Sequence, residues 1–186
     1  IDITEIDEFD NLHEPESGGL LDNAMKYTPD GGSMRFDGED LLSMPKRERA
    51  RRIAYVPQHI HFGALSVFDS VLMGRVSYFG TRAGKEDYAV VERILSDMKL
   101  DSFAARNAEE LSGGEKQKIA IARAMAQEPK LLVFDEPTGN LDPRRSLELM
   151  LLLEKINELG TTVLVVTHEK ELVNAFSKRV ISIDCG

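Results

Sequence analysis

The chain has 186 residues, enough for one domain with a sizeable core. Apolar residues make up 42% and charged residues 30%, as in globular proteins, and no apolar run is long enough to span a bilayer. The net charge of −9 argues against nucleic acid as a partner, because such partners need basic patches. The first 16 residues contain seven carboxylates and neither Lys nor Arg, so we expect no signal peptide there, and the single cysteine, Cys185, fits a reducing compartment.

Strand and helix patterns alternate along the chain, which predicts an α/β fold with a largely parallel sheet. We expect a weak strand at 1–9 and further strands at 34–36, 53–56, 131–135, 161–166 and 180–183, those at 131–135 and 161–166 being buried. Helices are expected at 20–27, 45–52, 67–73, 85–99, 114–126, 143–159 and 169–176. The helical stretch 66–128 would be a subdomain inserted into an α/β core made of 1–65 and 129–186, all in one domain.

Two carboxylates follow the most apolar of these strands. Asp135 and Glu136 stand at its carboxyl end, the edge of a parallel sheet where ligands bind. Asp135 could hold Mg²⁺, which prefers oxygen ligands, and Glu136 could polarise an attacking water. The alternative is a pair of solvated acids at the end of a strand.

A second motif, Ser112-Gly113-Gly114, precedes the helix expected at 114–126. Glycines let backbone N–H groups approach a phosphate, and the N-terminus of a helix favours anions. The alternative is an ordinary helix N-cap at Ser112.

The run Leu111-Ser112-Gly113-Gly114-Glu115, together with the strand ending in Asp135-Glu136, resembles the signature motif and Walker B strand of ABC-type ATPases. The resemblance implies a P-loop NTPase-like ABC ATPase core that uses ATP and Mg²⁺. It also implies two partners, a second ABC ATPase domain and a membrane permease. The chain would then lie in the cytoplasm, at the inner face of the membrane.

The same resemblance assigns roles to single residues. Gln58, after Tyr55-Val56-Pro57, is similar to the Q-loop glutamine that reaches Mg²⁺ and the attacking water. His168 resembles the switch histidine at the γ-phosphate, and Asp142 the D-loop acid that crosses to the partner domain. Ser112, Gly113 and Gly114 would contact the γ-phosphate held by the opposite subunit. Without this motif context, the alternative interpretation is that Gln58 is a surface glutamine and His168 a half-buried histidine.

Two parts of the chain resemble two different ABC subfamilies. Residues 53–128, with Val71-Leu72-Met73-Gly74-Arg75, are similar to ATPases of iron-siderophore and cobalamin importers. Residues 135–186 are more similar to the cell-division ABC ATPase. The substrate or task therefore stays open.

The phosphate loop of this family has no match. Its position corresponds to residues 10–17, where Glu16 replaces the lysine, Pro15 removes an N–H donor and only Ser17 agrees. We expect a shortened N-terminal region with a degenerate Walker A motif, and poor ATP binding by the isolated chain. ATPase activity is therefore left open, and a non-catalytic ABC-like interaction module is the alternative.

A different resemblance covers residues 20–32, which are similar to the N box of sensor histidine kinases, with Asn23 at the position of its Mg²⁺-binding asparagine. The later glycine boxes of that family are absent from the sequence, and thirteen residues do not make a kinase domain. A histidine-kinase ATP-binding fragment is the third reading.

Overall fold

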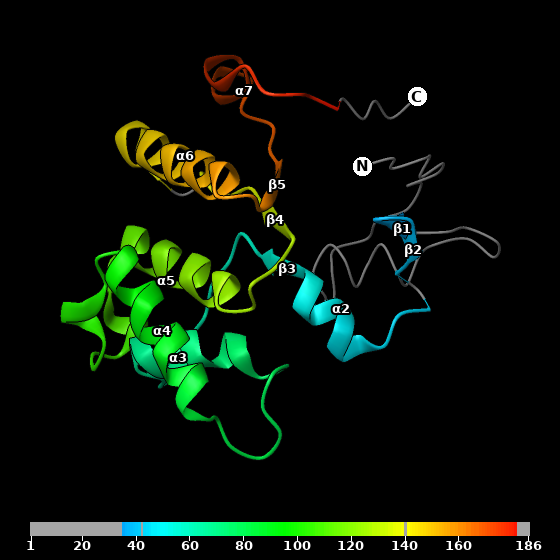
Figure 1. Ribbon diagram of the computed structural model, residues 1–186. Coiled ribbons are helices and arrows are strands. Elements are labelled where there is room, and N and C mark those ends of the chain that lie inside the picture. The colour runs from blue at the N-terminus through cyan, green and yellow to red at the C-terminus, as the bar shows by residue number, and fades with distance from the viewer. Residues whose placement is uncertain (1–34, 42, 140, 182–186) are drawn as a thin grey trace. The chain divides into compact units, whose positions relative to one another are not determined.

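The computed structural model describes residues 35–41, 43–139 and 141–181 (Figure 1). They fall into two compact units, one from Pro45 to Val166 and one made of the described residues before and after it. The strand expected at 1–9, the helix at 20–27, Ser17 and Asn23 lie outside the described residues. The boundaries proposed for the helical subdomain stay a prediction.

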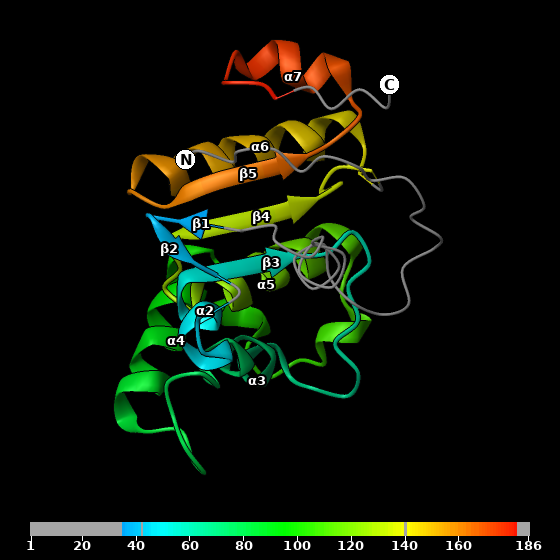
Figure 2. The ribbon, with the colours of Figure 1, turned by 90° about the vertical axis from the view of Figure 1, so that its right-hand side faces the viewer.

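The larger unit contains a parallel three-stranded sheet in the order β3-β4-β5, with β3 at Ile53–Val56, β4 at Leu131–Asp135 and β5 at Thr162–Val166. Figure 2 shows the three strands side by side and pointing the same way. The predicted parallel sheet is therefore confirmed. Strand β4 is central and its middle three residues are buried, as expected of a strand covered on both faces.

Strand β5 departs from the expectation of a buried strand. Its first four residues are half-buried and Val166 is exposed. Among the described residues β5 is hydrogen-bonded to β4 alone, at the edge of the sheet. An edge strand has fewer neighbours to cover its side chains, which a β-branched, apolar sequence does not reveal.

Helices cover the sheet and build a helical layer beside it. Helix α5 packs against β3, α6 packs against β5, and α3 and α4 pack against α5. The helices of this unit are α2 (Lys46–Arg52), α3 (Val67–Leu72), α4 (Lys85–Asp97), α5 (Gly113–Met125) and α6 (Pro143–Glu158), with 3₁₀ turns η1 (Met73–Arg75), η2 (Asp101–Phe103) and η3 (Ala108–Glu110). The helix predictions in this unit are confirmed to within two residues at each end.

One hydrophobic core joins the sheet to the helical layer. Val67 and Val71 of α3, Ile119 and Ile121 of α5 and Phe134 of β4 belong to it and are completely buried. Helix α5 lies between α3 and β3, so its position fixes how the helical layer meets the sheet.

A buried arginine anchors the carboxyl end of α5. Arg75 donates from Nε to Asp87 Oδ1 (3.1 Å) and from Nη1 to the Ala126 carbonyl (3.1 Å) and Glu128 Oε2 (2.7 Å). Its guanidinium also lies 3.7 Å from the centroid of the Tyr78 ring. Burial disfavours the charged guanidinium, yet the hydrogen bonds to Glu128 and Asp87 outweigh it and raise the pKa of Arg75.

The smaller unit contains a two-residue antiparallel hairpin, β1 (Arg35–Phe36) with β2 (Glu39–Asp40), and helix α7 (Lys170–Phe176). Asp37 and Gly38 form the turn at positive φ, 52° and 79°, which glycine adopts without strain. Val180 and Ile181 belong to no strand, so the described part of the strand expected at 180–183 is not confirmed.

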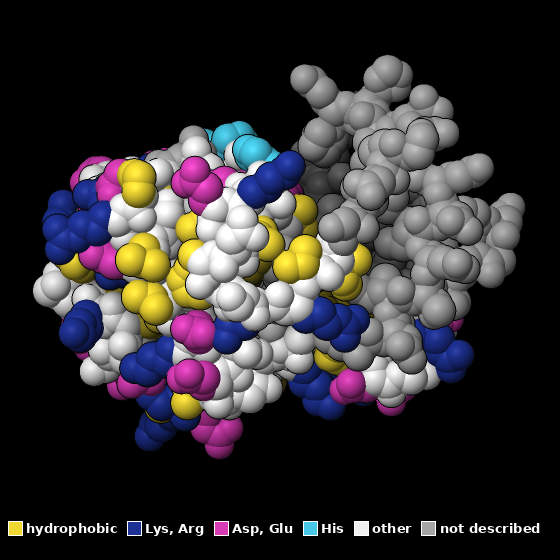
Figure 3. All heavy atoms as spheres, turned by 90° about the horizontal axis from the view of Figure 1, so that it is seen from above, with side chains coloured by type: hydrophobic (Ala, Val, Ile, Leu, Met, Phe, Trp, Pro, Cys, Tyr) yellow, Lys and Arg dark blue, Asp and Glu magenta, His cyan; other side chains and the backbone are white. Residues whose placement is uncertain are grey.

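The surface carries both signs of charge. Figure 3 shows one face, on which Lys and Arg are interspersed with Asp and Glu and apolar side chains lie between them. No helix among the described residues is both long enough and apolar enough to cross a membrane.

Candidate functional site

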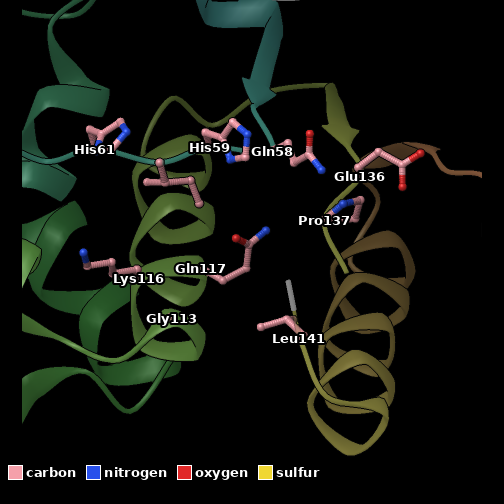
Figure 4. A pocket seen from close by; sticks show the side chains of 10 residues that line it. Gln58, His59, His61, Gly113, Lys116, Gln117, Glu136, Pro137 and Leu141 are labelled. Carbon is pink, nitrogen blue, oxygen red and sulfur yellow. The ribbon is translucent and has the colours of Figure 1, made fainter. Parts of the chain in front are cut away.

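A pocket of about 190 Å³ opens between the amino-terminal part of α5 and the segments that follow β3 and β4. It therefore brings together three motifs that are far apart in the sequence (Figure 4). Its lining residues are Gln58, His59, Ile60, His61, Gly113, Lys116, Gln117, Glu136, Pro137 and Leu141.

Gln58 reaches this pocket because β3 ends at Val56 and Pro57 cannot continue the ladder. Its carboxamide forms no hydrogen bond with any described residue, and its Nε2 lies 3.3 Å from where a side chain at Gly139 would begin. Gly139 therefore leaves space for Gln58 at the end of the sheet.

The two acids after β4 have different surroundings. Asp135 Oδ2 accepts a hydrogen bond of 2.9 Å from the Tyr55 hydroxyl of β3, which fixes the orientation of the carboxylate. Glu136 has φ 45°, a left-handed conformation that is unusual for a residue with a side chain. Its N–H donates to the Val166 carbonyl (2.9 Å), so the backbone is still bonded to β5 at the position that was predicted to be catalytic, where the positive φ ends the strand.

The first turn of α5 is held by its own residues. Ser112 is the N-cap, and Glu115 Oε2 accepts from both the Ser112 N–H (2.8 Å) and its hydroxyl (2.7 Å). These two hydrogen bonds lower the pKa of Glu115. A Cβ at Gly113 would meet nothing within 4 Å, whereas one at Gly114 would touch the Arg145 side chain. The backbone at Gly113 is therefore accessible.

Glu109 ties the wall of the pocket to α5. Its Oε2 accepts from the Phe62 N–H (2.8 Å) and its Oε1 from Lys116 Nζ (2.7 Å). The bond to Lys116, followed by that to Phe62, lowers the pKa of Glu109. One carboxylate thus joins the segment after Gln58 to the signature helix.

Of the predicted site residues that the structure describes, only Gln58, Gly113 and Glu136 line this pocket. Ser112, Gly114 and Asp135 are chain neighbours of lining residues.

The remaining three predicted site residues lie elsewhere or outside the described residues. Asp142 caps α6, accepting from the Arg145 N–H (3.1 Å), and it pairs with Arg145 Nε at 3.3 Å. His168 follows β5 and belongs to the smaller unit. Ser17 is outside the described residues. The roles predicted for Asp142, His168 and Ser17 stay predictions.

The residues present fit part of an ATP and Mg²⁺ site. The open helix terminus at Gly113 and an unpaired amide N–H on Gln117 suit phosphate oxygens, and Asp135 offers a carboxylate to a metal ion. Among the described residues, no three His, Cys, Asp or Glu side chains are grouped as a metal site. A metal ion here would need further ligands, such as phosphate oxygens and water.

Comparison with known proteins decides the family. The family described as "ABC transporter" matches residues 23–139, which include most of the stretch that resembles a kinase N box. The chain belongs to the ABC transporter ATP-binding family.

Two curated relatives and one solved structure show which family members this chain is similar to. It is 35% identical to an uncharacterized ABC transporter ATP-binding protein of Methanocaldococcus jannaschii, over 85% of this chain and 63% of that protein. It is 38% identical to the cell division ATP-binding protein FtsE of Bacillus subtilis, over 85% of this chain and 70% of that one. The resemblance to a cell-division ABC ATPase is therefore confirmed for the chain, and its assignment to residues 135–186 stays a prediction.

The solved structure is the ATP-binding cassette MJ0796, a dimer in a post-hydrolysis state bound to ADP and Pi. It matches with a TM-score of 0.66 at 30% identity, over 80% of this chain and 68% of that one. The predicted ABC ATPase fold is thereby confirmed. The chain spans about two thirds of the length of these three proteins.

Sequence reasoning missed several residues of the site, among them Tyr55, Glu109, Lys116 and Gln117. A weak signal marks Gln117, which stands four positions after Gly113 and so shares its helix face. Nothing in the sequence marks Tyr55 or Glu109, because their partners are brought close only by the sheet register and the packing of η3.

Proposed function

We propose that this chain is the ATP-binding subunit of an ABC transporter or ABC-type complex and that it works in trans. Ser112, Gly113 and Gly114 complete a nucleotide site whose phosphate loop belongs to a second ABC domain. The open backbone at Gly113, at the amino end of a 13-residue helix, carries the proposal. Its first-turn N–H groups and the positive end of the helix dipole favour a phosphate.

The partners and cofactors are part of the same proposal. A second ABC domain supplies the other half of the site, and a membrane permease holds the chain at the membrane surface. When bound, ATP supplies the phosphoanhydride bond whose cleavage drives the work. Asp135 would hold the metal ion, and Gln58 and Glu136 would orient water. MJ0796, which is a dimer bound to ADP and Pi, supports the pairing of two domains.

The alternative is a non-catalytic ABC-like module that only binds partners. The sequence at residues 10–17 favours it, because Glu16 stands where a lysine is needed and Pro15 lacks an N–H. The two readings differ in whether nucleotide promotes association.

The test is to mix the chain with an intact ABC subunit of matching interface and measure association by sedimentation with and without Mg²⁺-ATP. We expect association that depends on ATP and that Gly113→Asp abolishes, because the new carboxylate would stand where the phosphate binds. Gly80→Asp is the matched control, since Gly80 also has open space around it and lies outside α5. If association does not depend on ATP, or if Gly113→Asp does not weaken it, the proposal is wrong and the non-catalytic module is the remaining alternative.

A further inference from the structure

Helix α6 carries apolar side chains on more than the face that meets the sheet. It lies along β5 (Figure 2), and its inward positions Leu149, Leu153 and Ile156 are buried. Leu147 and Leu151 stand one turn apart on another face and are 48% and 51% exposed. A helix that covers a sheet needs only one apolar stripe. This second pair of leucines, the outer stripe, is therefore open to a partner.

The charges beside the outer stripe are separated along the helix axis. Arg144 stands three positions before Leu147, and Glu154 stands three positions after Leu151, all on one face. The Arg144 side chain is 88% exposed, and its Nε lies 3.4 Å from Glu148 Oε1. Exposed leucines alone are common on protein surfaces. Here, however, the spacing is the same from either end, with a cation at one end and an acid at the other, so the stripe is complementary to its own reversed copy.

An antiparallel pair of α6 helices satisfies this pattern in one register. Leu147 would lie against Leu151 of the second copy, and Arg144 opposite Glu154 of the second copy. Each contact would occur twice, because a two-fold axis makes the same patch face itself. A parallel pair would instead place like charges side by side at both ends of the stripe, which is unfavourable. The charges therefore select a second copy of the chain in the antiparallel orientation.

The outer stripe lies away from the motif expected to touch nucleotide. The Arg145 side chain reaches the first turn of α5, where it lies 3.6 Å from where a Cβ at Gly114 would stand. Leu147 follows Arg145 by two positions, which is about 200° around an α-helix. The outer stripe is thus on the opposite side of α6, and a contact there would leave the first turn of α5 open.

We propose that the outer stripe of α6 binds a second copy of this chain, antiparallel and without nucleotide. This inference does not rest on the proposed function, because Leu147, Leu151, Arg144 and Glu154 take no part in the nucleotide site. Two 16-residue helices, each about 24 Å long, bury less surface than a stable dimer needs, so the association is weak. It joins two chains while each still offers Gly113 to another ABC domain.

Sedimentation of the full chain without nucleotide tests the contact. Salt at about 0.15 M screens the repulsion between two chains of net charge −9. The mean mass should rise with protein concentration up to about 1 mM, a range that detects millimolar dissociation constants. Leu147→Glu and Leu151→Glu should each lower the association constant about tenfold or more, since each removes two apolar contacts from a symmetric pair.

The matched control is Leu65→Glu, at a leucine that is 40% exposed and lies outside α6. It should associate as the parent chain does. A parent chain that stays monomeric up to this concentration would overturn the proposal. So would a folded Leu147→Glu chain that associates as well as the parent.

Charge reversal tests the pairing without touching the leucines. Arg144→Glu and Glu154→Arg should each lower the association constant about threefold, because exposed ion pairs are weak. The double variant Arg144→Glu/Glu154→Arg restores both pairs and should recover the parent value. A double variant that associates no better than the single variants would contradict the register.

Cross-linking tests the orientation, in chains whose single cysteine is first removed by Cys185→Ser. In the antiparallel register, position 144 lies ten positions from its own copy, about 15 Å along the axis and beyond the reach of a disulfide. Arg144→Cys alone should therefore form little disulfide dimer under mild oxidation, whereas a mixture of Arg144→Cys and Glu154→Cys chains should form it readily. Arg144→Cys that cross-links to itself as fast as in the mixture would show parallel pairing and overturn the proposal.

Discussion

Helix α5 ends at Met125 beside a buried, paired arginine and begins at Gly113 beside a pocket with an unpaired amide. At the carboxyl end, Arg75 is bonded to two carboxylates and a carbonyl, and Gly74 is pressed against the Arg123 backbone. At the amino end, space around Gly113 is open, and Gln117 Nε2 has no hydrogen-bond partner among the described residues. The contacts at the carboxyl end stabilise the fold, and the open space at the amino end can take a ligand. Substitutions of Arg75 or Gly74 should therefore lower the free energy of unfolding, whereas those of Gly113 or Gln117 should leave it unchanged or raise it.

The largest effect is expected from Arg75→Met. Asp87 is 7% exposed, and the substitution removes its buried cation, the bond to the Ala126 carbonyl and the contact with the Tyr78 ring. Breaking one side of a buried ion pair costs about 3–5 kcal/mol. Urea unfolding followed by circular dichroism measures the change. A change in the free energy of unfolding near zero would show that Arg75 and its partners do not anchor α5.

A pair of glycines compares the two ends directly. A Cβ at Gly74 would overlap the Arg123 carbonyl oxygen and lie 3.0 Å from the Ala126 Cβ, so Gly74→Ala should destabilise the fold by about 1–3 kcal/mol. Gly113→Ala meets no atom within 4 Å and lies in a helix, so it should be neutral or stabilise by up to about 1 kcal/mol. Equal losses for both variants, measured in the same urea experiment, would contradict the difference between the ends.

These positions also show how far sequence reasoning reaches. The strands at 53–56 and 131–135 and the helix beginning beside Ser112-Gly113-Gly114 were predictable, because apolar runs, caps and turn residues are local signals. The partners of Arg75 were not, since Asp87 and Glu128 are 12 and 53 positions away and meet it only after α4 and α5 pack. The same holds for the bond from Tyr55 to Asp135, which depends on the register of β3 with β4. Gln58, Gly113 and Glu136 were predicted separately, and the pocket that brings them together is a product of tertiary packing.

A smaller, pH-dependent effect is expected from Glu109→Gln at the pocket wall. The folded chain lowers the pKa of Glu109, so its ionised form contributes stability at pH values above its ordinary pKa near 4.5. That contribution is lost as the pH falls through the lowered pKa. The parent chain should therefore be more stable than Glu109→Gln at pH 7, and the difference should shrink towards pH 3. Urea midpoints across this range measure it, and a difference that grows on acidification would reverse the assigned sign.

The smallest effect on stability is expected from Gln117→Met, and its sign separates a binding residue from a structural one. Methionine keeps the length of the side chain while removing the N–H that has no partner. The folded chain loses no hydrogen bond, and the desolvation cost of the buried donor disappears, so stability should stay the same or rise by less than about 1 kcal/mol. Arg75 would then be a polar residue that stabilises the fold, and Gln117 one that slightly destabilises it. A loss above about 1 kcal/mol in urea would show that Gln117 makes a stabilising contact, and the pocket at the amino end of α5 would be structural in the same way as the arginine cluster at the other end.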